Sequence, residues 1–205
     1  SAKLVDRIQA GRSPFGVVFA GDGRVLAVTG GDEDGEINLF DSESLKPLRS
    51  EPIGIAPVGV VAEPGGKSVL VALAGADQVV RVGVDDGKIK HTFKVPRAPD
   101  RIAVSPDGKS LLITHAGVRA DTVTQLDLHH GKTDKVHAGR LPSAVAWTRR
   151  GRRLIALGGA GQVVELRKGG GRRKHAVKGS PRALAVAGEK AWVVDGLTGK
   201  IERVG

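Results

Sequence analysis

The stretch that decides the fold is Pro99-Asp-Arg-Ile-Ala-Val-Ser-Pro-Asp-Gly-Lys-Ser-Leu-Leu-Ile-Thr114. It predicts a strand, a tight Pro-Asp-Gly turn and a second strand, because short apolar runs lie on both sides of residues with strong turn preference. Four eroded copies of this stretch begin at Pro14, Pro57, Pro142 and Pro181. We therefore interpret the chain as five repeats of one structural unit.

The spacing of the repeats indicates the kind of unit. The five opening prolines are separated by 43, 42, 43 and 39 residues. Strand-like runs in the third repeat cover residues 101–105, 110–114, 122–128 and 133–137, with a period of two rather than 3.6. Four strands within about 40 to 45 residues are typical of a β-propeller blade. The sequence thus predicts an all-β, five-bladed β-propeller with four antiparallel strands per blade.

The two ends of the chain predict how the ring closes. The repeat that opens at Pro181 contains only three strand-like runs, the last at residues 200–204. Residues 3–14 match the fourth-strand pattern of residues 88–99. We therefore expect residues 1–13 to supply the closing outer strand of a single domain, residues 1–205, without an exposed edge. The alternative is that the chain is a fragment of a larger ring.

The third repeat resembles the bacterial YVTN-type β-propeller repeat family. The resemblance rests on Pro99, residues 102–104, residues 106–109 and Leu111, while the eponymous tetrapeptide survives only loosely at residues 112–115. It implies a binding or scaffold role, often in an exported protein, and hence a periplasmic or secreted location. Its motifs are turn and core residues, so it carries no catalytic residue. Many members have seven blades, and five is a departure from that pattern.

The composition favours an anionic partner. Lys and Arg number 32 against 22 Asp and Glu, which gives a formal net charge of +10. Nucleic acid, a lipid surface, a polysaccharide or an acidic protein would all match this surplus. The absence of cysteine excludes disulfides and thiolate sites. No apolar run approaches about 18 residues, so no membrane span is predicted.

One face of the ring is predicted to carry a basic channel mouth. The connections between blades, and those between second and third strands, lie on the face where propellers commonly bind ligands. Arginines that converge there would bind a carboxylate or phosphate through forked hydrogen bonds. The candidate ligand-binding residues are Arg12, Arg97, Arg101, His115, Arg119, Arg140 and Arg182. Alternatively, these arginines pair with Asp100, Asp121 and Asp195 and hold the blades in register.

The opposite face is predicted to carry a second basic region, in blade 4. Its first turn and its third-to-fourth turn should bring eight cationic residues together, at a cost in self-repulsion that an anionic partner would relieve. These residues are Arg149, Arg150, Arg152, Arg153, Lys168, Arg172, Arg173 and Lys174. Nucleic acid would be bound through phosphate and without sequence readout, because no aromatic residue interleaves the charges. The alternative is a merely soluble basic surface.

Metal and catalytic motifs are not found in the sequence. The six histidines lack metal-ligand spacing, and no G-x-S-x-G elbow, phosphate-binding glycine loop or paired zinc motif is present. Acidic residues 32–36 are interpreted as a solvated turn rather than a calcium loop. Trp147 and Trp192 are expected to pack between neighbouring blades. The sequence predicts no metal and no cofactor.

The leading hypothesis is a monomeric, non-enzymatic binding or scaffold module that presents loops to a protein or anionic partner. One alternative is a ligand-binding, lyase or hydrolase site for an acidic or lactone substrate at the channel mouth. Another is non-specific binding of nucleic acid through the basic face of blade 4.

Overall fold

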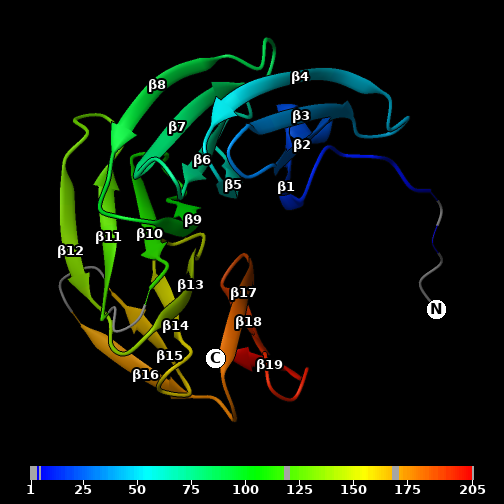
Figure 1. Cartoon of the computed structure of the whole chain (residues 1–205). Helices are drawn as coiled ribbons and strands as arrows, with labels where there is room; N and C mark the ends of the chain where they lie inside the picture. The colour runs from blue at the N-terminus through cyan, green and yellow to red at the C-terminus, as the bar shows by residue number, and fades with distance from the viewer. Residues whose placement is uncertain (1–3, 5, 118–120, 168–170, 205) are drawn as a thin grey trace.

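The computed structural model describes residues 4, 6–117, 121–167 and 171–204. The described part of the chain forms five antiparallel sheets, four of them with four strands and the last with three (Figure 1). It contains no α-helix, and so nothing helical that could cross a membrane. The all-β prediction is confirmed, and each sheet begins at one of the five prolines.

We call the five sheets blades 1 to 5, in chain order. Blade 1 contains β1 (Pro14–Ala20), the 3-10 turn η1 (Gly21–Gly23), β2 (Val25–Gly30), β3 (Gly35–Asp41) and β4 (Pro47–Gly54). Blade 2 contains β5 (Pro57–Ala62), β6 (Ser68–Leu73), β7 (Gln78–Gly83) and β8 (Ile89–Lys94). Blade 3 contains β9 (Pro99–Val104), β10 (Ser110–His115), β11 (Thr122–Asp127) and β12 (Thr133–His137).

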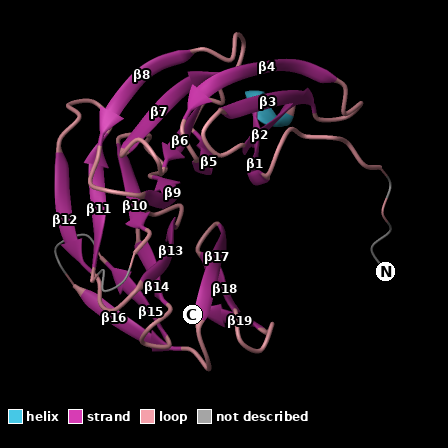
Figure 2. Ribbon diagram, in the orientation of Figure 1, coloured by secondary structure: helices cyan, strands magenta, loops and turns pink. Residues whose placement is uncertain are grey.

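The two remaining blades follow the same order. Blade 4 contains β13 (Pro142–Trp147), β14 (Arg153–Leu157), β15 (Gln162–Leu166) and β16 (Arg172–Ala176). Blade 5 contains β17 (Pro181–Ala187), β18 (Lys190–Asp195) and β19 (Ile201–Val204). Figure 2 shows the strands of each blade lying side by side in sequence order.

The Pro-Asp-Gly stretch forms the turn that the sequence predicts. The Gly108 amide donates to the Ser105 carbonyl over 2.9 Å, and Gly108 has a φ of +70°, which glycine adopts without steric cost. The Ser105 hydroxyl donates to Asp107 over 2.5 Å and accepts the Ser110 amide over 2.9 Å. Local hydrogen bonds therefore fix where β9 ends and β10 begins.

Apolar side chains join consecutive blades. The inner strands contact one another in the order β1, β5, β9, β13 and β17. Four buried clusters fill the four junctions between neighbouring blades, and each cluster takes residues from both blades. At the third junction, Leu112 of blade 3 and Ile155 of blade 4 are both fully buried. The core is thus a row of inter-blade layers.

The first and last blades each leave an apolar face exposed. Figure 1 shows the arc open between β1 and the sheet of β17–β19. Val17 and Phe19 on β1 are 63% and 64% exposed, and Ile201 on β19 is 68% exposed. The residues at the register position of Ile201 in blades 1 to 4 are all fully buried. They are Ile37, Val79, Val123 and Val163.

The closing pairing expected for residues 1–13 is not seen. Residues 1–3 and 5 lie outside the described residues, and the described residues from 6 to 13 form no strand. The Asn38 side-chain amide donates to the Ala10 carbonyl over 3.5 Å, so this segment lies against β3 of blade 1. Within the described residues, blade 5 therefore has three strands, and β19 is the outer one.

Core packing predicts the response to a cavity at the third junction. Leu112→Ala should lower the free energy of unfolding by about 2 to 5 kcal/mol, because the buried cluster loses apolar contact and retains a void. Leu48→Ala is the matched control, since Leu48 is 54% exposed and should change stability by less than about 0.5 kcal/mol. Urea unfolding measures both, and equal losses would contradict the inter-blade core.

Candidate functional site

The five inner strands surround a central hollow of about 440 Å³, which is lined by residues of β1, β5, β9, β13 and β17. Two of the predicted channel-mouth residues, Arg101 and Arg182, line it. The Arg101 guanidinium carbon lies 4.7 Å from the centre of the Phe15 ring, and Arg101 Nε lies 3.7 Å from Asp100 Oδ1. Arg101 therefore reaches across from blade 3 to blade 1.

Of the other predicted channel-mouth residues, those that the structure describes do not line this hollow. His115 donates from Nδ1 to the Arg97 carbonyl over 2.9 Å, and its Nε2 accepts from the Thr124 hydroxyl over 2.8 Å. Burial lowers the pKa of His115 below its ordinary value, so the ring is neutral at pH 7 and holds the connection between blades 2 and 3 against β11. Arg12 and Arg140 are exposed, and Arg119 lies outside the described residues.

Of the three aspartates predicted as alternative partners for these arginines, one is close to an arginine that the structure describes. Asp100 contacts Arg101, as predicted. Asp121 instead lies 3.8 Å from Nδ1 of His137. Asp195 accepts the Thr198 hydroxyl and the backbone amides of Ser180, Leu197 and Thr198, and these hydrogen bonds, that of the hydroxyl above all, lower its pKa to about 2. Asp195 thus fixes the connections around blade 5 rather than an arginine.

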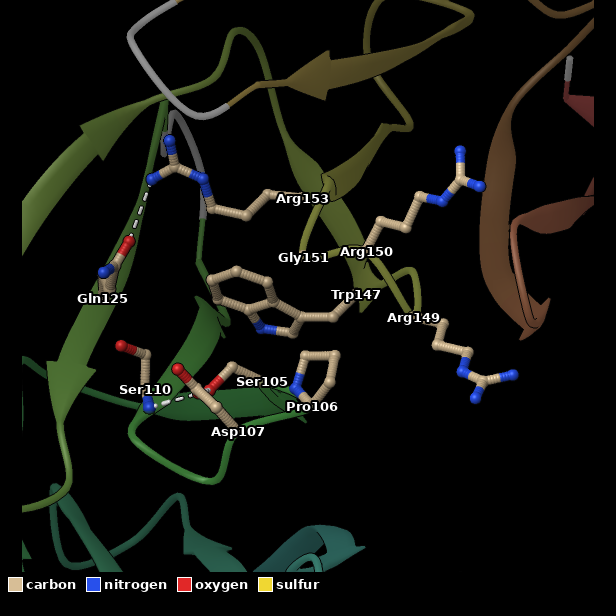
Figure 3. Close-up of a pocket in the computed structure, with 10 residues that line it drawn as sticks. All are labelled: Ser105, Pro106, Asp107, Ser110, Gln125, Trp147, Arg149, Arg150, Gly151 and Arg153. Carbon is tan, nitrogen blue, oxygen red and sulfur yellow. Dashed lines mark hydrogen bonds between the residues drawn. The ribbon is translucent and has the colours of Figure 1, made fainter.

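A larger cavity lies on the turn face, between blades 3 and 4. We call it the turn pocket; its volume is about 500 Å³. Figure 3 shows the side chains that surround it. Its lining residues are Ser105, Pro106, Asp107, Ser110, Gln125, Trp147, Arg149, Arg150, Gly151 and Arg153. The pocket forms here because the first turns of two consecutive blades stand beside each other.

Trp147 forms one wall of the turn pocket. The residue ends β13, and its indole packs against the buried cluster of blades 3 and 4, which confirms the expected inter-blade packing. Its Nε1 donates to the Ala103 carbonyl of blade 3 over 3.0 Å, so the ring orientation is fixed. Trp192, by contrast, lies between Ala191 and Val193 of the last cluster and points to the opposite, open face of blade 5.

Arg153 supplies the half-buried charge of the turn pocket. Its Nη1 donates to Oε1 of Gln125 over 2.9 Å, and partial burial lowers the pKa of the guanidinium while leaving it a cation. Among the described residues, no carboxylate lies within 4 Å of this guanidinium. A neutral amide is a weak partner for a half-buried cation, so an anion would stabilise the site.

Two exposed arginines lie at the rim of the turn pocket. The backbone amide of Arg149 donates to the Gly188 carbonyl over 3.0 Å, and that of Arg150 donates to Oε1 of Glu189 over 2.7 Å. Blade 5 therefore holds the turn in place. Figure 3 shows both side chains extending away from Trp147. Their guanidiniums can contact an anionic partner that extends beyond the pocket.

The remaining members of the predicted basic region point in several directions. The Arg172 guanidinium donates to the His137 carbonyl of blade 3, whereas Arg173 and Lys174 are exposed on β16. Arg152 turns toward blade 5, and Lys168 lies outside the described residues. An aromatic ring beside these charges was not predicted from the sequence. The available signal was the position of Trp147, two residues before the basic turn.

An ion network joins blade 4 to blade 5 on the other side of the sheet. Glu165 is only 1% exposed and lies 2.7 Å from Arg167, 3.2 Å from Arg152 and 3.4 Å from His175. Arg152 also contacts Glu189 over 3.0 Å. Burial tends to raise the pKa of Glu165, but hydrogen bonds from Arg167 and His175 and the charge of Arg152 outweigh it, so the pKa is lowered. The network neutralises one predicted patch arginine.

The described residues contain no group of three or more His, Asp or Glu side chains placed to hold a metal ion. In the acidic loop, Glu36 accepts a hydrogen bond from the Ser50 hydroxyl over 3.2 Å. His129 and His130 donate their backbone amides to Asp127 over 2.8 Å, which makes them part of a turn.

Comparison with known proteins shows which solved structures share this architecture. No family model matches the sequence, and no curated protein matches it significantly. Among solved structures, hydrazine synthase of Kuenenia stuttgartiensis is similar at a TM-score of 0.74 and 18% identity, over 92% of this chain and 58% of that one. The Cps50 (Swd1) β-propeller domain of Myceliophthora thermophila is similar at 0.74 and 16%, over 94% and 65%. Virginiamycin B lyase of Staphylococcus aureus is similar at 0.63 and 14%, over 94% and 84%.

These similarities define the class of protein as a β-propeller. At such identities the likeness concerns the fold alone. The chain spans less than two thirds of the length of the first two of these structures, 58% and 65%. The five-bladed count agrees with the five sheets, and the ring is open in the described part of the chain.

The ion network predicts a pH-dependent stability. Glu165→Gln should lower the free energy of unfolding by about 1.5 to 3 kcal/mol at pH 7, because Arg167 and Arg152 lose hydrogen bonds to a buried charged acceptor, although Arg152 keeps its contact with Glu189. The folded-state pKa of Glu165 is lowered, so its contribution is present above the unfolded-state value of about 4.3 and is lost as the pH falls through the folded-state value.

Urea unfolding between neutral and acidic pH tests this expectation. The stability gap between the wild type and Glu165→Gln should narrow as the pH falls. Glu51→Gln serves as the control, because its contact with Arg49, 3.6 Å long, is more exposed and should contribute less than about 1 kcal/mol. A gap that stays constant down to acidic pH would show that the carboxylate charge is unimportant.

Proposed function

We propose that this protein is a non-enzymatic binding module that presents the turn face of blade 4 to an anionic partner. The observation that carries the proposal is Arg153, a half-buried guanidinium whose partner is the neutral Gln125 amide. A bound anion would replace water around this cation with a charge-assisted hydrogen bond. The formal net charge of +10 favours encounter with such a partner over long range.

The rim strengthens this proposal. Arg149 and Arg150 lie on a turn that blade 5 anchors through backbone hydrogen bonds, so their positions are fixed while their side chains stay exposed. Exposed guanidiniums on a rigid turn bind anions at a low cost in backbone entropy. The partner would thus be a polyanion or an acidic protein surface that spans the rim and the pocket.

A second candidate function is an enzyme site in the central hollow. Arg101 and Arg182 could stabilise the carboxylate or enolate of an acidic or lactone substrate there. Virginiamycin B lyase is named as a lyase and has a similar fold, which supports considering this chemistry. His115, the predicted partner for such chemistry, is committed to two structural hydrogen bonds. We therefore rank the turn pocket above the hollow.

We also propose that the N-terminal segment closes the ring by pairing with β19. In each of blades 1 to 4, the fully buried residue of the third strand that matches Ile201 has a partner on the fourth strand. That partner always lies six positions before the next opening proline, as His175 does where it pairs with Val163. The same register would pair Ile8 with Ile201. It would also place Arg7 opposite Glu202 and Asp6 opposite Arg203. Apolar and opposite-charge cross-strand pairs each stabilise a sheet.

A disulfide tests this closure, because the chain has no native cysteine. Arg7→Cys with Glu202→Cys should form an intramolecular disulfide on mild oxidation, since directly opposite residues on paired strands lie within disulfide reach. Arg7→Cys with Lys132→Cys is the control and should stay reduced. Non-reducing electrophoresis distinguishes monomer from dimer. Disulfide-linked dimers would instead indicate strand exchange between two copies, and free thiols in both pairs would contradict closure.

Charge reversal tests the anionic partner. Arg149→Glu with Arg150→Glu should weaken the binding of inorganic polyphosphate by about tenfold or more and reduce its salt dependence. The melting temperature should change little, because both side chains are exposed. Arg24→Glu with Lys67→Glu gives the same change in net charge on exposed turns of blades 1 and 2. Equal losses in both pairs would assign the binding to net charge rather than to blade 4.

A further inference from the structure

We propose that the turn pocket binds a nucleotide, with its base against the Trp147 indole and its phosphate on Arg153. This inference rests on the proposed function, because both place an anion on the turn face of blade 4. It adds an aromatic requirement that a plain polyanion does not satisfy. The sequence predicts no base stacking at these charges, but the Trp147 indole lies among them in the structure (Figure 3).

The indole is prepared for stacking. Its packing against the cluster of blades 3 and 4 and the bond from Nε1 to Ala103 fix the ring before any ligand arrives. The ring is nevertheless only half-buried, and it lines a cavity of about 500 Å³, which lies within the usual range for small-ligand sites. A base stacked on a fixed aromatic ring gains contact without an ordering cost to the protein.

The polar groups of the turn pocket are divided between two sides of the indole. Figure 3 shows Arg153 on one side and Asp107, Ser105 and Ser110 on the other. Asp107 accepts the Ser105 hydroxyl and the Lys109 amide, and these bonds lower its pKa, so it remains an anion. This carboxylate repels a phosphate and accepts N–H donors. A ligand therefore places its anion at Arg153 and a donor edge at Asp107.

Nucleotides combine the three features that this arrangement selects. They carry a flat aromatic ring, N–H donors on its edge and a phosphate at the other end. A phosphate ester without an aromatic ring would use Arg153 alone and leave the indole and Asp107 without partners. The ligand can be a free nucleotide or one unit of a single strand. In a strand, the neighbouring phosphates would reach Arg149 and Arg150 at the rim.

Tryptophan fluorescence tests this inference directly. The chain has two tryptophans, so Trp192→Phe leaves Trp147 as the only reporter. Titration with adenosine 5′-monophosphate should quench Trp147 saturably, and ribose 5-phosphate should bind about tenfold more weakly, because it lacks the base. In the same background, Arg153→Gln should weaken the nucleotide about tenfold, whereas Arg24→Gln should change it less than about twofold. Circular dichroism confirms that each variant is folded.

A single-stranded oligodeoxyadenylate distinguishes a free nucleotide from a nucleotide within a nucleic-acid strand as the ligand. If the oligonucleotide binds about tenfold more tightly than the monophosphate, and Arg149→Gln with Arg150→Gln removes this difference, the ligand is a nucleic-acid strand. Equal affinities for strand and monophosphate identify a free nucleotide. These rim arginines are exposed, so they also keep the test valid if Arg153→Gln unfolds the protein.

Two outcomes would overturn the inference. One is ribose 5-phosphate binding as tightly as the nucleotide; the other is nucleotide binding without any change in Trp147 fluorescence. Polyphosphate binding that still depends on Arg149 and Arg150 would then leave the proposed function standing. Loss of that dependence would refute the proposed function separately.

Discussion

Apolar contact between consecutive sheets is the interaction on which the rest of this structure depends. Each blade presents apolar side chains on both faces, because residues that point to opposite sides of an inner strand face the preceding and the following blade. Four such contacts bury the clusters at the four junctions. The same pattern explains why Val17 and Ile201, at the two ends of the arc, are exposed. They are core positions without a neighbouring blade.

Inter-blade packing also creates the turn pocket. Because blades 3 and 4 lie face to face, the turn after β9 and the turn after β13 are held beside each other. Trp147 is the last residue of β13, where the buried layer meets the surface, so its indole packs on the buried cluster and also lines the turn pocket. Polar groups on the opposite side of blade 4 secure this arrangement. The network around Glu165 and Glu189 fixes blade 5 against the same turn.

The central hollow and the turn pocket differ in how their charges are satisfied. Arg101 in the hollow stacks on Phe15 and lies near Asp100, so the fold already provides partners for it. Arg153 in the turn pocket has an amide as its partner. A half-buried cation without a carboxylate gains more from an anionic ligand than one that is already paired. This difference is the reason for proposing the turn face, rather than the hollow, as the binding site.

The sequence by itself determined the strands, the turns and their repetition, because these depend on local preferences and on a period of two. The glycine turn at Gly108 and the sheets that open at the five prolines follow directly from such signals. The register that would pair Ile8 with Ile201 is also contained in the repeat. Tertiary structure alone decided which charged side chains lack an oppositely charged partner and so remain available to a ligand. Arg152 and Arg153 are neighbours in sequence, but alternation along the strand directs one to Glu165 and the other to Gln125. Trp147 and Arg153 are partners within the β13–β14 hairpin, so their proximity is local, but the pocket beside them required blades 3 and 4 to pack.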